Sequence, residues 1–418
     1  MKKYDLAVIG GGFAGVSAAL AAARGGARVI IIEKSNCLGG AAVNCLVNPF
    51  MKFSTNIDGV AVPLSQGIFA EILSKLRNIG TDVEDNLHFN EEYLKLILNE
   101  MVLKEGIELL YHAYLSEVER DGERINAVIL STICGKVKIE ADYFIDATGD
   151  AQLSFLAGCP TKLGRESDNL CQPMTLCFRV GNVDVQKFNL SKPALQAAYK
   201  EAQSKGEITN PRENILTFRM PTKNIVHFNT TRVVKKNPTD PFDLTEAEII
   251  ARRQVFETYE FVKKHADGME NSFLMSTAME IGVRESRMIV GDYVLTEQDC
   301  LNCVKFDDAI AACNYDIDIH NPEGTGTSHH YFAGGEYYTI PYRSLIPKGV
   351  SNMLVAGRCI SSDHGAQASY RVMSPVACIG EAAGTAIALA IKNKSTTRAV
   401  DVQLLQKALK NNGAYLGI

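Results

Sequence analysis

The 418-residue sequence has no tryptophan, no strong excess of charge and no long uncharged apolar run. It holds 43 Lys and Arg against 48 Asp and Glu, a formal net charge of −5 at pH 7. A nucleic-acid partner needs a broad basic field, and this balance supplies none. Because 22% of the residues are charged and 46% are hydrophobic, the composition also excludes a largely disordered, collagen-like or coiled-coil chain.

Membrane insertion and a disulfide framework are not expected either. The most apolar late segment, Val372 to Ile391, contains Glu381 and several small residues. The apolar stretch at the N-terminus is interrupted by Asp5 and a run of three glycines, so it does not read as a signal peptide. The 11 cysteines are odd in number and scattered through the chain, which favours a reducing compartment. We expect a cytoplasmic protein.

The length predicts two to three domains, at about 150 residues each. The N-terminal pattern predicts a strand over Lys3–Ile9, a helix over Phe13–Arg24 and a strand over Arg28–Ile32. Such a βαβ unit implies a parallel sheet with a right-handed crossover. A helical pattern follows over Glu71–Lys104. Three short strands are then predicted between Leu109 and Glu140.

The next elements begin with a separate buried strand over Tyr143–Ala147. The middle of the chain predicts a mixed layer with three strands, over Met174–Val180, Ile215–Met220 and Ile225–Val234. An amphipathic helix should begin at a capping box of Thr245 and Glu248 and end at His265.

The early pattern then returns. Leu354–Ala356 resembles the first strands, and Ser374, as N-cap, and Pro375 should open the last long helix. The predicted class is α/β, with a discontinuous Rossmann-like domain and an inserted mixed α+β substrate or cap domain. The boundaries follow as 1–155 for the first part, 156–335 for the inserted domain, 336–395 for the second part and 396–418 for a C-terminal helical tail.

A glycine fingerprint lies directly after the first strand. Gly10, Gly12 and Gly15 form G-x-G-x-x-G, with Ala14 inside it. The first glycine permits a tight turn, the second lets a pyrophosphate approach the backbone, and the third lets helix and strand pack closely. Glu33 ends the second strand, where a carboxylate accepts both ribose hydroxyls of an adenosine and repels a 2′-phosphate. The spacing predicts a dinucleotide site that disfavours NADP.

An NAD-only domain would continue with repeated βαβ units, but this chain runs through Gly39-Gly40 into a helical insertion and a three-strand meander. That layout, with Thr148-Gly149-Asp150 after it, resembles the glutathione-reductase-like class of FAD-dependent enzymes. More of the chain resembles FAD-dependent oxidoreductases of the FAD_oxidored type. The matching stretches run from Gly39 to Asn48, Gly282 to Arg287, Tyr338 to Pro347 and Val355 to Met373, and end in Gly380-Glu381-Ala382-Ala383-Gly384.

The resemblance implies FAD as the cofactor and assigns residues to it. The ADP half would be held by the glycine turn with Glu33 and Lys34, and the adenine by the backbone of Leu115. The pyrophosphate, ribityl chain and flavin would lie along the remaining residues, which are Gly39, Gly40, Ala41, Thr148, Gly149, Asp150, Gly357, Arg358 and the helix start at Ser374. The positive end of that helix would face the N1/C2 oxygen side of the flavin, where reduction deposits negative charge.

Five residues are candidates for the chemistry. His364 follows the flavin-side glycine, and His330 lies beside His329 in a Gly/Thr-rich loop; imidazole titrates near neutrality and suits a general acid or base. Either can also be a structural or solvated histidine. Arg284 and Arg343 could clamp a carboxylate or stabilise an oxyanion, or simply pair with one of the acidic residues Glu280, Glu285 and Asp363.

The fifth candidate, Cys45, departs from relatives in a loop near the flavin ring. It is either a redox or nucleophilic thiol or a small buried residue. The cluster Asp316, Asp318 and His320 lacks a second ligand set or a glycine-based calcium loop, so no metal is expected.

These observations predict hydride transfer between a small organic substrate and flavin N5. The nearest alternative is a fumarate-reductase-like flavoprotein that reduces an activated alkene. A further alternative is a flavin- or NAD-binding sensor or scaffold without catalysis. A second G-x-G-x-x-G for NAD(P)H is absent, so the electron donor or acceptor is a second substrate, a small carrier, a partner protein or oxygen. Substrate identity and homo-oligomer formation stay open.

Overall fold

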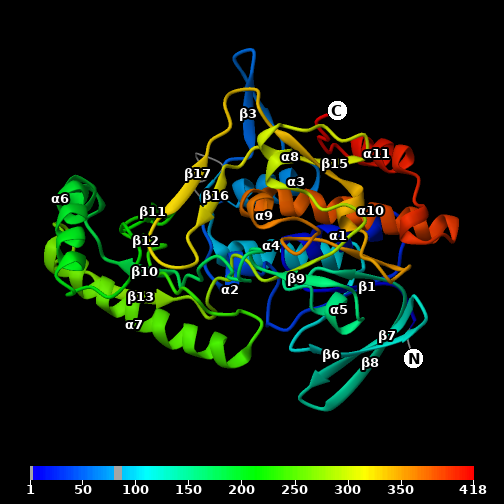
Figure 1. Cartoon of the computed structure of the whole chain (residues 1–418), viewed down its shortest axis with the longest axis horizontal. Helices are drawn as coiled ribbons and strands as arrows, with labels where there is room; N and C mark the ends of the chain where they lie inside the picture. The colour runs from blue at the N-terminus through cyan, green and yellow to red at the C-terminus, as the bar shows by residue number, and fades with distance from the viewer. Residues whose placement is uncertain (1–2, 80–86) are drawn as a thin grey trace.

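The computed structural model describes residues 3–79 and 87–418. A parallel sheet forms its centre (Figure 1). The strands lie in the order β5 (Glu108–Leu110), β2 (Val29–Ile32), β1 (Tyr4–Ile9), β8 (Gly135–Asp146) and β19 (Met353–Val355). These short strands are rich in β-branched residues and mostly buried on both faces, as parallel sheets require. The α/β class and the N-terminal βαβ unit predicted from the sequence are confirmed.

Strand β8 corrects one prediction. The third strand of the meander and the strand expected over Tyr143–Ala147 are one continuous strand. Its first half pairs antiparallel with β7 (Arg124–Thr132), which pairs with β6 (Tyr114–Asp121), and its second half pairs parallel with β1 and β19. Polar residues at Glu140 and Asp142 interrupt the apolar pattern where the strand changes partners, although the backbone continues.

Alternate side chains of the central strands enter different cores. Leu6 and Val8 of β1 pack with the helices α1 (Phe13–Arg24), α3 (Ile68–Asn78), α4 (Glu91–Lys104) and α10 (Met373–Asn393). Ala7 and Ile9 pack against the meander on the opposite face. Because successive strand residues point to opposite faces, each strand contributes to both layers. The helical pattern predicted over Glu71–Lys104 falls on α3 and α4, and residues 80–86 of it lie outside the described residues.

Helices α1 and α10 pack closely and run in the same direction. A Cβ atom on Gly380 would lie 2.1 Å from the carbonyl oxygen of Ala14, and one on Gly384 would lie 2.0 Å from that of Ala18. Relative to this contact, α10 begins six residues earlier than α1. At about 1.5 Å per residue, its N-terminus extends about 9 Å beyond that of α1. By length and composition α10 could span a membrane, but most of it is buried in the protein.

A second sheet lies to one side of the molecule (Figure 1). Its order is β11 (Thr217–Arg219), β12 (Val226–Phe228), β10 (Phe178–Gly181) and β13 (Phe273–Thr277), and α6 (Val185–Ser204) and α7 (Pro241–His265) pack on it. Its core is separate from the two cores of the central sheet and draws on residues between Met174 and Ile281, with Leu46 added. We call this unit the cap.

The starts of two helices differ from the sequence prediction. Helix α7 begins at Pro241 and not at Thr245, because Asp240 caps it by accepting hydrogen bonds from the N–H groups of residues 242 and 243, at 2.9 and 3.0 Å. A proline at the first helical position costs no hydrogen bond, so the helix gains a turn. Helix α10 begins at Met373 after Val372, and Ser374 lies inside its first turn and not at the N-cap.

Three small antiparallel pairs connect the cap to the central sheet. They are β9 (Thr161–Leu163) with β14 (Arg287–Ile289), β15 (Ala309–Cys313) with β18 (Tyr338–Pro341), and β16 (Ile317–His320) with β17 (Thr327–His330). Apolar residues of β15, β16 and β18 belong to the helix-side core of the central sheet. Strands β15 and β16 precede residue 335 and β18 follows it, yet all three share this core. The predicted domain boundary at residue 335 stays a prediction.

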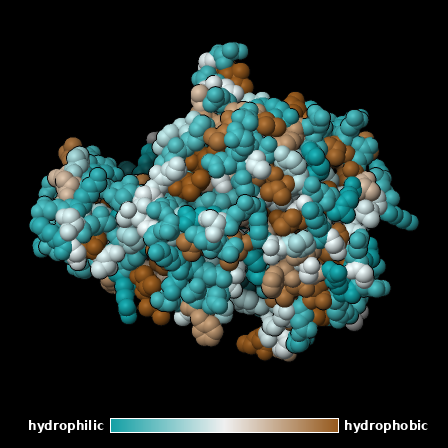
Figure 2. All heavy atoms as spheres, in the orientation of Figure 1, coloured by the Kyte–Doolittle hydropathy of each residue, from teal (hydrophilic) through white to brown (hydrophobic). Residues whose placement is uncertain are grey.

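A buried ion pair also joins the cap to the central domain. The guanidinium of Arg179 on β10 donates two hydrogen bonds to the carboxylate of Glu91, the first residue of α4. On the face shown in Figure 2, most of the surface is hydrophilic and hydrophobic residues lie scattered among the others. The remaining elements are α2 (Ala41–Asn44), β3 (Ser54–Ile57), β4 (Val60–Pro63), α5 (Gln152–Leu156), α8 (Glu297–Leu301), η1 (Tyr342–Leu345), α9 (His364–Tyr370), η2 (Thr397–Ala399) and α11 (Val402–Asn411).

Candidate active site

The glycine fingerprint forms a tight turn at the carboxyl end of β1. Gly10 has a φ of +105°, and a Cβ on it would lie 2.4 Å from the carbonyl oxygen of Ala147. A Cβ on Gly15 would lie 1.9 Å from the carbonyl oxygen of Gly10. By contrast, a Cβ on Gly12 would meet only Gly40, at 3.8 Å. The first and third glycines thus serve the fold, and the second leaves the backbone open to a ligand.

Besides the four-residue α2, two helices begin at this edge without side-chain caps. The N-caps of α1 and α10 are Gly12 and Val372, and neither accepts a hydrogen bond through its side chain. Ala14 lies in the first turn of α1, next to Gly357 and Gly380. Among the described residues, six other helices are capped by a side chain, which belongs to Asn90, Asp184, Asp240, Thr296, Asp363 or Asp401. The first-turn N–H groups of α1 and α10 are therefore available to a phosphate or another anion.

Glu33 faces the glycine turn from the end of β2. Its two carboxylate oxygens accept the N–H groups of Gly11, at 2.6 Å, and Ser35, at 2.8 Å, and the residue is buried. A carboxylate oxygen has two acceptor positions, so each retains one for a ribose hydroxyl. The neighbouring Lys34 forms an ion pair with Glu280 of the cap, with 3.2 Å between Nζ and Oε2.

Gly39 and Gly40 lie directly on the fingerprint. The N–H of Gly39 donates to the carbonyl of Gly11 at 2.8 Å. A Cβ on Gly40 would lie 2.9 Å from the Cα of Gly12, and both loop glycines have positive φ angles. Ala41 then starts α2. The two glycine segments form a wall of backbone without side chains, which fits an extended pyrophosphate.

Asp150, which follows Gly149 after β8, forms an ion pair with Arg358, which follows Gly357 after β19. Arg358 Nη2 lies 2.7 Å from Asp150 Oδ1, which also accepts a hydrogen bond from the hydroxyl of Ser286 at 2.6 Å. Burial acts to raise the pKa of Asp150, but Arg358 and these hydrogen bonds outweigh it and lower the pKa. Gly149 makes room for the Arg358 guanidinium, which a Cβ would approach to 3.0 Å.

The other residues assigned to the cofactor occupy the margins of this edge. Thr148 bonds to the carboxylate of Asp146 through its hydroxyl, at 2.7 Å. The carbonyl of Leu115 accepts a hydrogen bond from the side chain of Gln152 at 2.9 Å, and its contact with an adenine stays a prediction. Within the described chain, the hydroxyl of Ser374 is buried without a hydrogen-bond partner.

The segment 281–287, which we call the connecting segment, links this edge to His364. Ser286 donates to Asp150, while Glu285 Oε1 lies 2.8 Å from Nδ1 of His364. The other oxygen of Glu285 accepts the N–H of Gln172 at 2.8 Å, and the carboxylate is fully buried. Arg284 lies next along the segment. The structure thus brings together His364 and Arg284, two of the five candidates for chemistry.

Cys45 lies against the same segment, with Sγ 3.6 Å from the carbonyl oxygen of Ile281. Burial raises the pKa of its thiol to about 12. A reactive cysteine needs a thiolate, which requires a lowered pKa. The environment of Cys45 is that of a small buried residue, which is the structural alternative left open above.

The remaining two candidates lie elsewhere. Arg343 forms a bidentate ion pair with Asp308, at 2.9 and 3.1 Å, and its side chain is half exposed. This is the structural alternative for Arg343, although the acid is not one of those expected. His330 is exposed at the end of β17, with its ring against Phe332. Neither environment resembles a substrate site.

Sequence reasoning missed two residues of this region. Glu285 was considered only as a partner for arginine, whereas it holds His364; its place between Arg284 and Ser286 in a family-like stretch was the available signal. Gln172 was not considered, although its side chain bonds to that of Gln367 on α9 at 3.0 Å. No local pattern marks it, because its partners lie more than a hundred residues away.

A family model described as FAD dependent oxidoreductase matches residues 5–409. The chain belongs to this family. A comparison with curated proteins found no match. Of the solved structures that are similar, p-nitrophenol 4-monooxygenase from Pseudomonas putida has a TM-score of 0.50 and 12% identity, with 100% of this chain and 90% of that chain covered. At this identity the likeness concerns the fold alone.

A geranylgeranyl bacteriochlorophyll reductase-like protein from Thermoplasma acidophilum is also similar, with a TM-score of 0.47 and 14% identity over 98% of this chain and 83% of that chain.

The family to which our chain belongs identifies its cofactor as FAD. The residues present fit it: two uncapped helix N-termini, a glycine wall and a buried carboxylate with free acceptor positions meet at one edge of the sheet.

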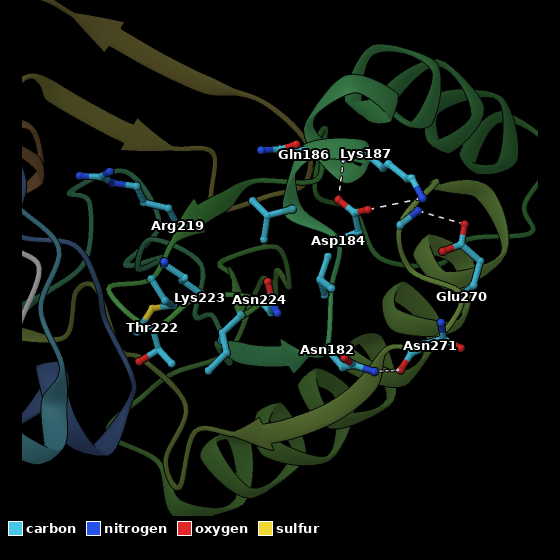
Figure 3. Close-up of a pocket in the computed structure, with 15 residues that line it drawn as sticks. Asn182, Asp184, Gln186, Lys187, Arg219, Thr222, Lys223, Asn224, Glu270 and Asn271 are labelled. Atoms are coloured by element: carbon cyan, nitrogen blue, oxygen red, sulfur yellow. Dashed lines mark hydrogen bonds and ion pairs between the residues drawn. The ribbon is translucent and has the colours of Figure 1, made fainter.

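The cap holds a separate cavity of about 630 Å³ (Figure 3). Its lining comes from the start of α6, the turn after β11 and the loop before β13, with Asp184, Lys223 and Glu270 among the residues. The lining shares no residue with the connecting segment or the glycine turn. We therefore assign the cavity no part in flavin chemistry.

Proposed function

We propose that this FAD-dependent oxidoreductase transfers a hydride between a small organic substrate and the flavin. The observation that carries the proposal is the connecting segment, which joins Asp150 at the cofactor edge to His364 through the adjacent residues Ser286 and Glu285. Bound FAD would supply the redox step by exchanging a hydride at N5. The chain must then bind the substrate, orient it and exchange one proton with it.

His364 is the residue we propose for the proton. Its Nδ1 faces the buried carboxylate of Glu285, so Nδ1 carries the hydrogen and donates it, and Nε2 is the acceptor. A carboxylate in this position holds the ring orientation and stabilises the imidazolium that forms when Nε2 takes a proton, as in the Ser-His-Asp arrangement. The role of Glu285 is that of a positioning residue.

Replacing His364 by glutamine is expected to slow reduction or oxidation of the flavin by about 10²-fold or more, the usual contribution of general acid–base catalysis. Purified protein would be screened anaerobically with small metabolites for bleaching of the flavin spectrum, and the variant tested with the substrate found. FAD content should stay unchanged. An unchanged bleaching rate would remove His364 from the mechanism, and a flavin that no metabolite reduces or oxidises would favour a sensor or scaffold.

Replacing Glu33 by alanine is expected to weaken FAD retention by about tenfold or more, because two charge-assisted hydrogen bonds to the ribose are lost. The check is the ratio of flavin to protein absorbance after dialysis. Glu117 is an exposed carboxylate on β6 and provides a matched control, Glu117→Ala, that should keep its FAD. Full FAD content in Glu33→Ala would refute the ribose assignment.

The electron partner is proposed from the same residues. One dinucleotide fingerprint serves FAD, so we propose that a second substrate, a carrier, a partner protein or oxygen completes the cycle. All 11 cysteines are free thiols, which supports the proposed cytoplasmic location.

A further inference from the structure

Four guanidinium groups gather where the cap meets β16. They belong to Arg212 and Arg232 of the cap, Arg284 of the connecting segment, and Arg371. His320 lies among them, with Nδ1 3.1 Å from Arg232 Nη2 and 3.4 Å from Arg212 Nη1. We call this group the arginine cluster. Its members are brought together by the fold from positions that span about 160 residues.

Within the part of the chain that the structure describes, two of the four arginines have an acidic partner and two do not. Arg232 Nη1 lies 3.1 Å from Glu213, and Arg371 Nη2 lies 3.6 Å from Asp318. Arg284 Nη1 donates to the carbonyl of residue 173 and to the hydroxyl of residue 175, both at 2.6 Å. Its partners are neutral.

The hydrogen-bond partners of Arg212 are also neutral. It donates through Nε to the side-chain carbonyl of Asn214 at 3.2 Å, and its other partner is His320. In residues 3–79 and 87–418, no carboxylate lies within ion-pair distance of Arg212 or Arg284. Both have only neutral partners.

His320 does not add to the charge. A guanidinium can only donate, so the Nδ1 atom that faces two of them must accept, and the hydrogen lies on Nε2, 3.2 Å from Asp318 Oδ2. Burial and the nearby Arg284 lower the pKa of His320 well below its usual value. With His320 neutral, four arginines face Glu213 and Asp318, and two positive charges are left unbalanced.

This excess charge is costly inside a protein. A buried charge without a partner loses its hydration and gains no ion pair in return. Burial, together with repulsion from Arg371 and Arg212, lowers the pKa of Arg284 to about 9, so Arg284 still carries its charge at neutral pH. An arrangement of this kind fits an anion with two charges, because forked guanidinium groups pair bidentately with carboxylates.

The cluster is next to the proposed reaction site. Arg284 directly precedes Glu285, and its carbonyl accepts a hydrogen bond from Gln367 of α9 at 2.7 Å. Arg371 lies at the C-terminal end of α9, two residues before α10, whose uncapped N-terminus borders the flavin site. An anion held by these arginines would thus lie beside His364 and the cofactor edge.

We propose that the arginine cluster binds a small organic dicarboxylate, and that this is the class of substrate oxidised or reduced by the flavin. The inference rests on the proposed function. It also gives the cap a role, because Arg212 and Arg232 belong to the cap and close the site over a substrate that reaches the connecting segment.

The test is calorimetric titration of the FAD-loaded protein with malonate, with acetate, inorganic phosphate and chloride compared at equal ionic strength. Malonate should bind more tightly than the other three. Arg284→Gln and Arg212→Gln should each weaken malonate binding at least tenfold. Arg343→Gln, which removes an exposed guanidinium paired with Asp308, should bind malonate as the wild type does.

Preference for phosphate over malonate, equal binding of malonate and chloride by the wild type, or equal malonate affinity in a folded cluster variant and Arg343→Gln would each overturn the proposal. If one cluster variant fails to fold, the other and the wild-type titration decide. FAD content and metabolite bleaching are recorded in the same preparations. Bleaching of the flavin by an uncharged metabolite, without malonate binding, would contradict this inference but not the proposed function. Absence of FAD would contradict the proposed function, whether or not malonate binds.

Discussion

Alanine in place of Gly384 is expected to destabilise the protein by about 3 kcal/mol or more, at or above the upper end for overpacked cores. The new Cβ would lie 2.0 Å from the carbonyl oxygen of Ala18, a backbone atom that moves only if α1 and α10 separate. In an isolated helix the same change would stabilise by about 1 kcal/mol. The sign of the effect therefore reports the helix–helix contact, and the measurement is thermal or urea unfolding.

Gly324 offers a matched control. A Cβ there has no heavy atom within 4 Å, and its φ is not in the left-handed region. Gly324→Ala should leave the stability unchanged or raise it slightly, because alanine restricts the unfolded chain. If Gly384→Ala were as stable as Gly324→Ala, the close parallel packing of α1 and α10 would be wrong. The positions of both helix N-termini at the cofactor edge depend on that packing.

Replacing Glu381 by glutamine is expected to stabilise the protein at pH 8 by about 3 kcal/mol while changing little at pH 4.5. Glu381 is buried in α10, and its Oε2 accepts the N–H of Ile68 at the start of α3, at 2.9 Å. Burial raises its pKa to about 7, the hydrogen bond and Arg24 oppose this rise, and Glu71 adds to it. Glutamine keeps an acceptor for Ile68 without a charge.

The pH window follows from the direction of the shift. The folded protein holds the Glu381 proton up to about pH 7, whereas the unfolded chain releases it at its ordinary pKa, near 4.5. In the wild type, the contribution of protonated Glu381 to the free energy of unfolding is fully present below the unfolded pKa. This contribution is lost as the pH rises through the folded pKa, so the advantage of glutamine appears at high pH. Unfolding of the wild type and Glu381→Gln at pH 4.5 and 8 tests this, with the exposed Glu117→Gln as control. A glutamine variant that loses stability equally at both pH values would contradict the account.

Local signals in the sequence were enough to predict the cofactor half of the fold. The βαβ unit, the glycine fingerprint and Glu33 lie within 33 residues, so short-range patterns specify the turn, the helix and the carboxylate together. The continuous β8 was missed because Glu140 and Asp142 interrupt its apolar pattern, while pairing with two different neighbours keeps the backbone extended. The start of α7 was misplaced because Asp240 competes with Thr245 as a cap and is strengthened by Pro241.

The candidate site was predictable only in part. His364 and Arg284 were selected by residue type and nearby glycines, and the structure places both at the connecting segment, where His364 bonds to Glu285 and Arg284 directly precedes Glu285. The arginine cluster was not visible, because its residues are far apart in sequence and charge balance becomes a constraint only after burial. Arg343 shows the reverse case: the same residue type in a family-like stretch has a half-exposed guanidinium that is paired with Asp308. Exposure of the guanidinium and the charge of its partner, more than residue type, separate these two arginines.

The central claim is that the uncapped N-termini of α1 and α10, the glycine wall and Glu33 hold FAD. It is tested most directly by unfolding the purified protein and identifying the released cofactor by chromatography and mass spectrometry. We predict FAD at about one molecule per chain. Release of NAD, or of FMN, which lacks the adenosine that Glu33 is assigned to bind, would contradict the account.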